Sequence, residues 1–132
     1  MISITKESIA FEELKSLIVE RLKPLNPDEI ILFRGNFFAK AKTVFTSFGS
    51  YAYGTPNEDS DIDLYIVTND DFMPQGWREK SKVYLKYANQ LNDIIEQYPT
   101  DLIVHTRKMY EIFLNMDSMF SRKIFSQGKI IL

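Results

Sequence analysis

The sequence contains no cysteine, only one tryptophan and one histidine, and no long apolar run. The absence of cysteine excludes disulfide bonds and cysteine-ligated zinc sites. No apolar stretch approaches the ~20 residues that a membrane-spanning helix needs, so we expect no membrane partner. Residues 1–15 mix acidic and basic side chains and do not resemble a signal peptide, which favours a soluble, cytoplasmic protein.

The acidic and basic residues nearly balance, and the net charge is only −2. A general nucleic-acid binder is usually distinctly basic, so we do not expect nucleic acid as a partner. The chain has 132 residues, of which 45% are hydrophobic and 26% charged, and these proportions are typical of a globular protein. We therefore expect a single domain over residues 1–132 with one ordinary core.

The spacing of apolar residues predicts a mixture of helices and strands. Amphipathic helices are predicted at residues 8–23, 77–98 and about 108–125. Short apolar runs predict strands at residues 28–33, 42–48, 61–67, 100–106 and 129–132. The predicted fold class is α/β (α+β), a small mixed β-sheet flanked by helices.

Two aspartates, Asp61 and Asp63, begin the predicted strand "DIDLYIV". Because strand side chains alternate between faces, both lie on the side of Tyr65, while the neighbouring aliphatic side chains face the core. Like charges about 7 Å apart along a strand repel each other unless a cation lies between them. One interpretation is a solvated pair on an exposed sheet face, and the other is a site for a divalent metal such as Mg²⁺.

A Gly-Ser turn precedes these carboxylates, with ten residues between Ser50 and Asp61. Glycine lets the backbone approach a ligand closely, and N–H groups at the start of a helical turn attract phosphate. Gly-Ser pairs are common in ordinary turns, so Gly49 and Ser50 alone are a weak signal. Their fixed spacing to the aspartates is what makes the signal specific. The combination indicates a phosphate site beside a metal site.

A third carboxylate, Asp101, begins the predicted strand 100–106. If this strand lies beside residues 61–67, Asp101 joins Asp61 and Asp63. Three carboxylates and two metal ions roughly 3.5–4 Å apart can catalyse in-line phosphoryl transfer, and Asp101 is the candidate to accept the proton of the acceptor hydroxyl. The structural alternative is that Asp101 caps the start of its strand. His105 is interpreted as a satisfied strand-end histidine.

The segment "FGSYAYGTPNEDSDIDLYIV" resembles the signature of the DNA polymerase β-like nucleotidyltransferase superfamily, and it is most similar to the minimal stand-alone domains that are often paired with a HEPN-domain protein. The resemblance implies the nucleotidyltransferase fold, with phosphate binding at Gly49 and Ser50. It implies that Asp61, Asp63 and Asp101 hold two Mg²⁺ ions. The implied reaction transfers a nucleoside monophosphate, AMP, from an NTP such as ATP to an acceptor hydroxyl. A tyrosine of a partner HEPN toxin is the implied acceptor, which gives the chain an antitoxin role.

Residues 34–48 depart from the family pattern, because they separate the strand 28–33 from the Gly-Ser turn. Either residues 43–48 form the strand before the turn, or the whole segment is an added hairpin. Two alternative functions are a catalytically idle antitoxin or adaptor that acts by binding, and a nucleotidyltransferase acting on RNA ends. A domain this small also predicts an acceptor site completed by a partner or by a second copy in a homo-oligomer.

Three lysines lie close together on the predicted helix 77–98, namely Lys80, Lys82 and Lys86. We interpret them as a solvated face, although one of them could reach a phosphate. The sequence does not select which one.

Overall fold

The computed structural model describes residues 11–34, 62–116 and 129–132. Several predicted features lie outside these residues: the Gly-Ser turn, Asp61, the strand at 42–48 and residues 35–48 of the predicted insertion. The fold and the site are therefore built here from the described segments alone.

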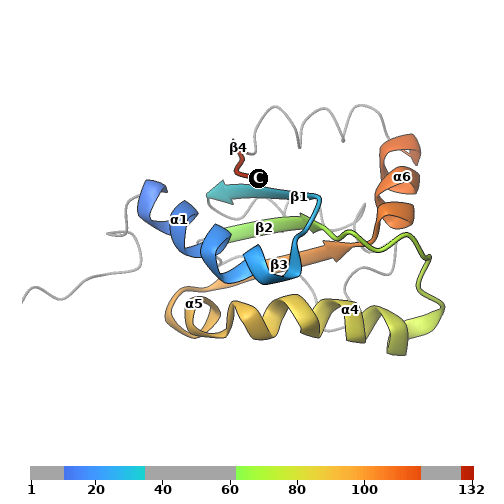
Figure 1. The fold of residues 1–132 in the computed structure, drawn as a ribbon, viewed down its shortest axis with the longest axis horizontal. Helices are drawn as coiled ribbons and strands as arrows, with labels where there is room; N and C mark the ends of the chain where they lie inside the picture. The colour runs from blue at the N-terminus through green and yellow to red at the C-terminus, as the bar shows by residue number, and fades with distance from the viewer. Residues whose placement is uncertain (1–10, 35–61, 117–128) are drawn as a thin grey trace, which may run out of the picture.

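A four-stranded mixed sheet forms the centre of the described structure, in the order β3-β2-β1-β4 (Figure 1). Its strands are β1 (Glu29–Arg34), β2 (Ile62–Val67), β3 (Thr100–His105) and β4 (Lys129–Ile130). β1 runs antiparallel to both β2 and β4, whereas β2 and β3 are parallel. The strands predicted at 28–33, 61–67, 100–106 and 129–132 are thus confirmed, and so is the mixed α+β class.

β2 is the best-enclosed strand of the sheet. It pairs along its whole length with β1 on one edge and with β3 on the other. All six residues of β2 are buried.

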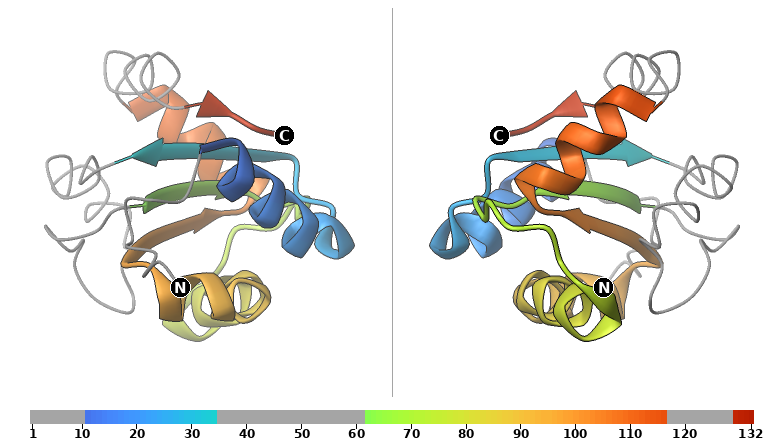
Figure 2. Two further views of the ribbon diagram at one scale, coloured as in Figure 1. Left: turned by 90° about the vertical axis from the view of Figure 1, so that its left-hand side faces the viewer. Right: turned by 90° about the vertical axis from the view of Figure 1, so that its right-hand side faces the viewer.

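Helices cover both faces of the sheet (Figure 2). They are α1 (Phe11–Leu22), the short 3-10 helix η2 (Lys23–Leu25), α4 (Gly76–Gln90), α5 (Asn92–Gln97) and α6 (Arg107–Met116). α1, α4 and α5 pack on one face, where their apolar side chains join those of the strands in one core cluster. α6 packs against the opposite face, near the carboxyl end of β3.

The single helix predicted at 77–98 is wrong in one respect, because two helices occupy that segment. α4 ends at Gln90, and the N–H of Leu91 bonds to the carbonyl of Ala88 instead of continuing the α-helical pattern. α5 then begins at Asn92. The buried side chains of Leu91, Ile94 and Tyr98 stay on one apolar stripe across the break. The spacing of apolar residues therefore could not reveal it.

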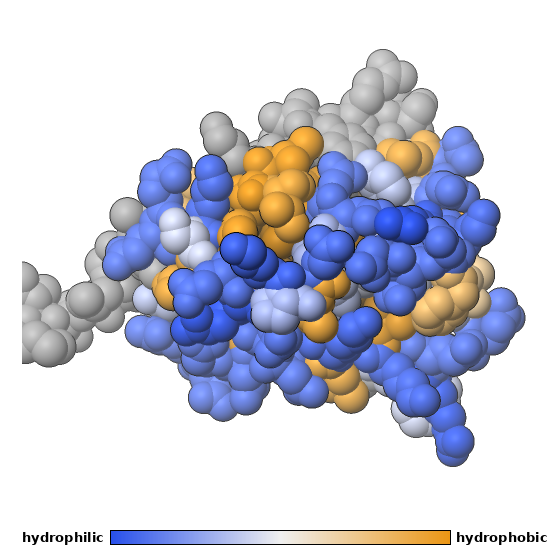
Figure 3. Space-filling view, viewed as in Figure 1, coloured by the Kyte–Doolittle hydropathy of each residue, from blue (hydrophilic) through white to orange (hydrophobic). Residues whose placement is uncertain are grey.

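The apolar core consists of one continuous cluster between the sheet and the α1, α4 and α5 helices. Fully buried members include Leu14 and Ile18 of α1, Leu64 and Ile66 of β2, and Tyr87 of α4. The surface differs near β4, where Ile130 and Leu132 are exposed and Figure 3 shows an apolar area. Among the described helices, none combines the length and apolarity needed to cross a membrane.

Candidate active site

Asp63 of β2 and Asp101 of β3 are direct neighbours in the sheet. The parallel register places Asp63 opposite Asp101, so both side chains leave the sheet on the same face. Adjacent strands lie about 4.8 Å apart, which brings the two carboxylates within reach of one shared cation. The grouping of Asp101 with Asp63 required residues 100–106 to lie beside residues 61–67, and the structure meets this condition.

The two carboxylates lie on the face opposite the apolar core. On β2, Leu64 and Ile66 belong to the core cluster, and on β3 so do Leu102 and Val104. Side chains one residue away along each strand point the other way. Asp63 thus lies on the face that α6 partly covers.

Burial separates the two interpretations of this pair. Asp63 is 0% exposed and Asp101 is half-buried. A buried carboxylate is costly unless it is hydrogen-bonded, paired or bound to a metal. The solvated pair on an exposed sheet face, which was the simple alternative, therefore does not describe Asp63. A carboxyl group placed in the interior beside a second one is more typical of a binding or catalytic site.

The remaining predicted site residues, Gly49, Ser50 and Asp61, lie outside the described residues. The three-carboxylate cluster is therefore not tested, and the structure brings together two of its three members. Within the described segments, no group of three acidic, histidine or cysteine side chains is placed to hold a metal ion.

His105 and Tyr65 form a buried pair farther along the same face. The Tyr65 hydroxyl and the Nδ1 atom of His105 are joined by a hydrogen bond of 2.6 Å, and both residues are 0% exposed. Phe113 of α6 packs against both rings, with centroids 5.5 Å from Tyr65 and 5.7 Å from His105. The prediction that His105 is a satisfied strand-end histidine is confirmed.

Burial controls the protonation of this pair. It lowers the pKa of His105 to about 3, and the positive charge of Lys80 adds to that effect. It also raises the pKa of Tyr65 well above the ordinary value. Both side chains are consequently neutral near pH 7, and His105 is not a proton carrier at that pH.

Sequence reasoning missed how α6 is fixed at the carboxyl end of the sheet. The guanidinium of Arg107 binds both carboxylate oxygens of Asp28, with Nη2 at 2.9 Å from Oδ1, and its Nη1 lies 3.0 Å from Asp71. The backbone N–H of Arg107 also donates to the carbonyl of Asp70. These contacts tie the start of α6 to the segments that flank β1 and β2. The residues that Arg107 contacts are distant from it in sequence, so no local sequence pattern predicts these contacts.

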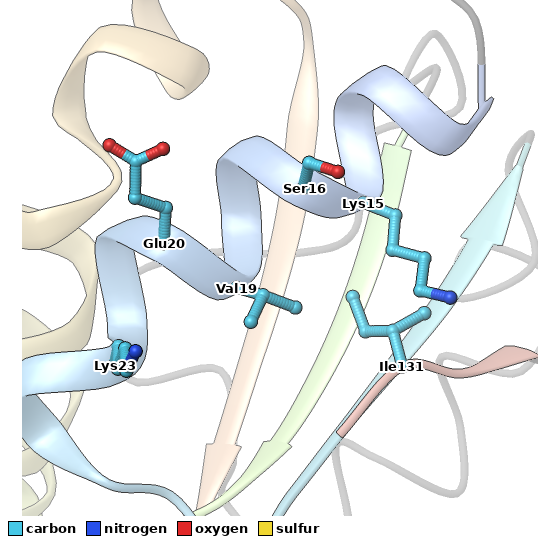
Figure 4. A pocket seen from close by; sticks show the side chains of 6 residues that line it. All are labelled: Lys15, Ser16, Val19, Glu20, Lys23 and Ile131. Carbon is cyan, nitrogen blue, oxygen red and sulfur yellow. The ribbon is translucent and has the colours of Figure 1, made fainter.

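A shallow groove of about 380 Å³ lies elsewhere, between α1 and the end of the chain (Figure 4). It is lined by Lys15, Ser16, Val19, Glu20, Lys23 and Ile131. α1 covers the apolar-core face of the sheet, whereas Asp63 and Asp101 leave the opposite face. The groove is therefore separate from the carboxylate pair.

Comparison with known proteins identifies the family to which this arrangement belongs. A family model described as "Nucleotidyltransferase domain" matches residues 29–130, from the start of β1 to the end of β4, and so includes both carboxylate-bearing strands. Searches of curated proteins and of solved structures gave no match. The match supports a general activity of nucleotide transfer. Because it spans most of the chain, this protein belongs to the nucleotidyltransferase domain family.

Proposed function

We propose that this protein transfers a nucleoside monophosphate, AMP, from ATP to an acceptor hydroxyl in a reaction that depends on Mg²⁺. The observation that carries the proposal is the register pair of Asp63 and Asp101, with Asp63 fully buried. A buried carboxylate directly beside a second one costs desolvation and like-charge repulsion, which a bound cation would offset. The family match supports the reaction class.

The donor chemistry of the described pair fits Mg²⁺, which prefers carboxylate oxygens and nucleotide phosphates. We propose that Asp63 and Asp101 hold the metal together with Asp61, which lies two residues before Asp63 in the chain. When bound, Mg²⁺ neutralises charge on the phosphates and on the leaving group. Gly49 and Ser50 are proposed to bind the triphosphate through backbone N–H groups and the serine hydroxyl.

The proposed reaction is an in-line displacement at the α-phosphorus. The acceptor oxygen forms a bond to this phosphorus, and the bond from phosphorus to the oxygen of the β-phosphate breaks. Pyrophosphate leaves with the electron pair of that bond. Asp101, which is half-buried and not fully enclosed, receives the proton of the acceptor hydroxyl.

For the acceptor, we propose a tyrosine hydroxyl on a partner protein of the HEPN type, which gives this chain an antitoxin role. The support for this step is the resemblance of the Gly-Ser and Asp-x-Asp signature to HEPN-paired domains.

The test is transfer of label from ATP carrying a radioactive α-phosphate, with the protein and its candidate partner, in Mg²⁺ or in excess chelator. Asp63→Asn should reduce label transfer by about a hundredfold to a thousandfold, the typical effect of losing a transition-state charge stabiliser. Asp93→Asn is the matched control, because Asp93 is an exposed aspartate of α5 that pairs with Arg21.

Circular dichroism of each variant tests whether a loss of activity is due to a loss of folded structure. Transfer by Asp63→Asn at the rate of Asp93→Asn would reject the role of the pair. Transfer that persists in chelator would reject the metal dependence. If wild type and Asp63→Asn both neutralise the partner and neither transfers label, the chain acts by binding alone.

A further inference from the structure

β4 is the last strand of the sheet, and one of its two edges pairs with none of the described strands. The order β3-β2-β1-β4 places β1 beside β4 and ends the described sheet there. The N–H of Ile131 donates to the carbonyl of Ile30 on β1 at 2.9 Å. Because the hydrogen-bonding groups of successive residues point to alternate edges of a strand, those of Ile130 and Leu132 point away from β1. They form a short row of donors and acceptors that a further strand could pair with.

The side chains at this edge are aliphatic. We call residues 129–132 the β4 edge. Ile130 is 52% exposed and Leu132 is 47% exposed, whereas Ile131 is 8% exposed and belongs to the core cluster. Figure 3 shows an apolar area beside β4. Proteins usually protect an edge strand from pairing with charged side chains, proline or a bulge. The β4 edge has no proline and only one charged residue, Lys129, so it stays suited to pairing.

The groove between α1 and the end of the chain provides space on the core face of the β4 edge. Ile131 lines the groove, and Lys15 and Val19 of α1 lie across from it (Figure 4). A strand added beside β4 would place every second side chain on this face, next to the groove. An apolar cavity of about 150 Å³ holds a benzene ring. The groove, at about 380 Å³, can therefore accept an aliphatic side chain from an added strand.

We propose that the β4 edge pairs with the β4 edge of a second copy of this chain, antiparallel and about a two-fold axis at Ile131. In this register Ile130 lies opposite Leu132 of the second copy, and the two residues exchange both backbone hydrogen bonds. Their exposed side chains cover each other on one face, and the two Ile131 side chains meet beside the groove on the other. Lys129 lies outside the three paired residues, so like charges do not face each other. The β4 edge thus complements itself, as a two-fold interface requires.

This pairing joins the four-stranded sheets of two copies into one continuous sheet. Only three residues of each copy pair, which is far less than a standard protein–protein interface contains, so the dimer should dissociate on dilution. The contact involves neither Asp63 nor Asp101 and does not depend on the proposed transfer reaction. Asp63→Asn is therefore expected to dimerise as the wild type does, whatever its activity.

Sedimentation equilibrium of the full chain, at concentrations from about 10 μM to 1 mM, covers the range of weak association. The average mass should rise with concentration towards twice that of the monomer. Ile130→Lys should weaken the dimer by about tenfold or more, because it replaces two aliphatic cross-strand contacts with charges at the edge. Leu85→Lys is the matched control, because Leu85 is an aliphatic residue of α4 that is 45% exposed. This control should dimerise as the wild type does.

Cysteine cross-linking tests the register. The chain contains no cysteine, so a single-cysteine variant can form a disulfide between copies only at the substituted position. The Cα atoms of the two Ile131 residues, a directly opposite pair without mutual hydrogen bonds, would lie about 4.5 Å apart, within the range of a disulfide. The two Leu132 residues would be diagonal neighbours about 7–8 Å apart, which is too far. Ile131→Cys should therefore cross-link faster than Leu132→Cys, although Leu132 is more exposed.

Random collisions give the opposite order of cross-linking, because an exposed cysteine reacts more readily than a buried one. Cross-linking of Leu132→Cys at the rate of Ile131→Cys or faster would therefore overturn the two-fold register. A chain that stays monomeric at every concentration would overturn the dimer, and so would equal association by Ile130→Lys and Leu85→Lys. Growth beyond a dimer would also overturn it, because a two-fold contact closes on itself. Circular dichroism of each variant checks that it is folded.

Discussion

The two faces of the sheet are built from the same strands but carry different kinds of side chain. On one face, the side chains of β2 and β3 are aliphatic, and they pack against α1, α4 and α5 in a continuous core. On the other face, the same strands carry Asp63, Asp101, Tyr65 and His105. Three of these four polar side chains are 0% exposed.

The contrast separates residues that stabilise the fold from residues whose burial has a free-energy cost. Alternation along a strand explains the aliphatic face completely, because every second residue must bury apolar surface. It gives no reason for a buried carboxyl group or a buried histidine on the other side. Burying these polar groups costs desolvation, so function is the better explanation for Asp63, and the hydrogen bond to Tyr65 explains how His105 is accommodated.

The largest expected stability effect comes from the aliphatic face. Leu64 is 0% exposed and lies between Asp63 and Tyr65 in the chain while pointing to the other side. Leu64→Ala should lower the free energy of unfolding by about 2–5 kcal/mol, because it removes buried methyl groups and leaves a cavity. Urea unfolding followed by circular dichroism measures the loss. A loss below about 1 kcal/mol would mean that this face is not the stabilising core.

Acidification should destabilise the polar face. His105 has a pKa of about 3 in the folded state and an ordinary value of 6.5 when unfolded. Between these values the unfolded chain binds a proton that the folded chain does not. The resulting stability is therefore complete above about pH 6.5 and is lost as the pH falls towards 3. We expect a loss on the order of a few kcal/mol over that window.

Unfolding by urea at a series of pH values, for the wild type and for His105→Gln, isolates this contribution from that of the carboxylates. The wild type should lose more stability on acidification than the variant. Parallel pH profiles for the two proteins would show that His105 is not held neutral by burial.

A smaller effect is expected from the hydrogen bond between Tyr65 and His105. Tyr65→Phe keeps the ring that packs against Phe113 and removes the hydroxyl that contacts Nδ1 at 2.6 Å. The buried ring nitrogen then loses this partner, which should cost about 1–3 kcal/mol. The matched control is Tyr98→Phe, in the aliphatic core, whose phenol is not the partner of His105. Equal losses in both variants would contradict a special role for the pair.

The sequence predicted most of the sheet and one part of the site. Short apolar runs located β1, β2 and β3 to within one residue at each end. Period-two alternation then placed Asp63 and Asp101 on the face opposite the aliphatic residues. The register that makes them direct neighbours came from the structure, since strand pairing is a long-range property.

Other features could not be predicted, because they depend on residues distant in sequence or do not change the spacing of apolar residues. The break at Leu91 leaves the apolar stripe intact, and the Arg107 contacts join residues far apart in the chain. The complete burial of Asp63 depends on what covers the second face of the sheet, which the pattern of one strand does not record.

The central claim is that Asp63 and Asp101 act as one unit in nucleotide transfer, and a double-mutant cycle tests it most directly. Label transfer from ATP is measured for the wild type, Asp63→Asn, Asp101→Asn and the double variant, each shown to be folded. Residues that act as a unit are strongly non-additive, so the double variant should be about as slow as the slower single variant. Full activity in either single variant, or rate losses that multiply in the double variant, would contradict the claim.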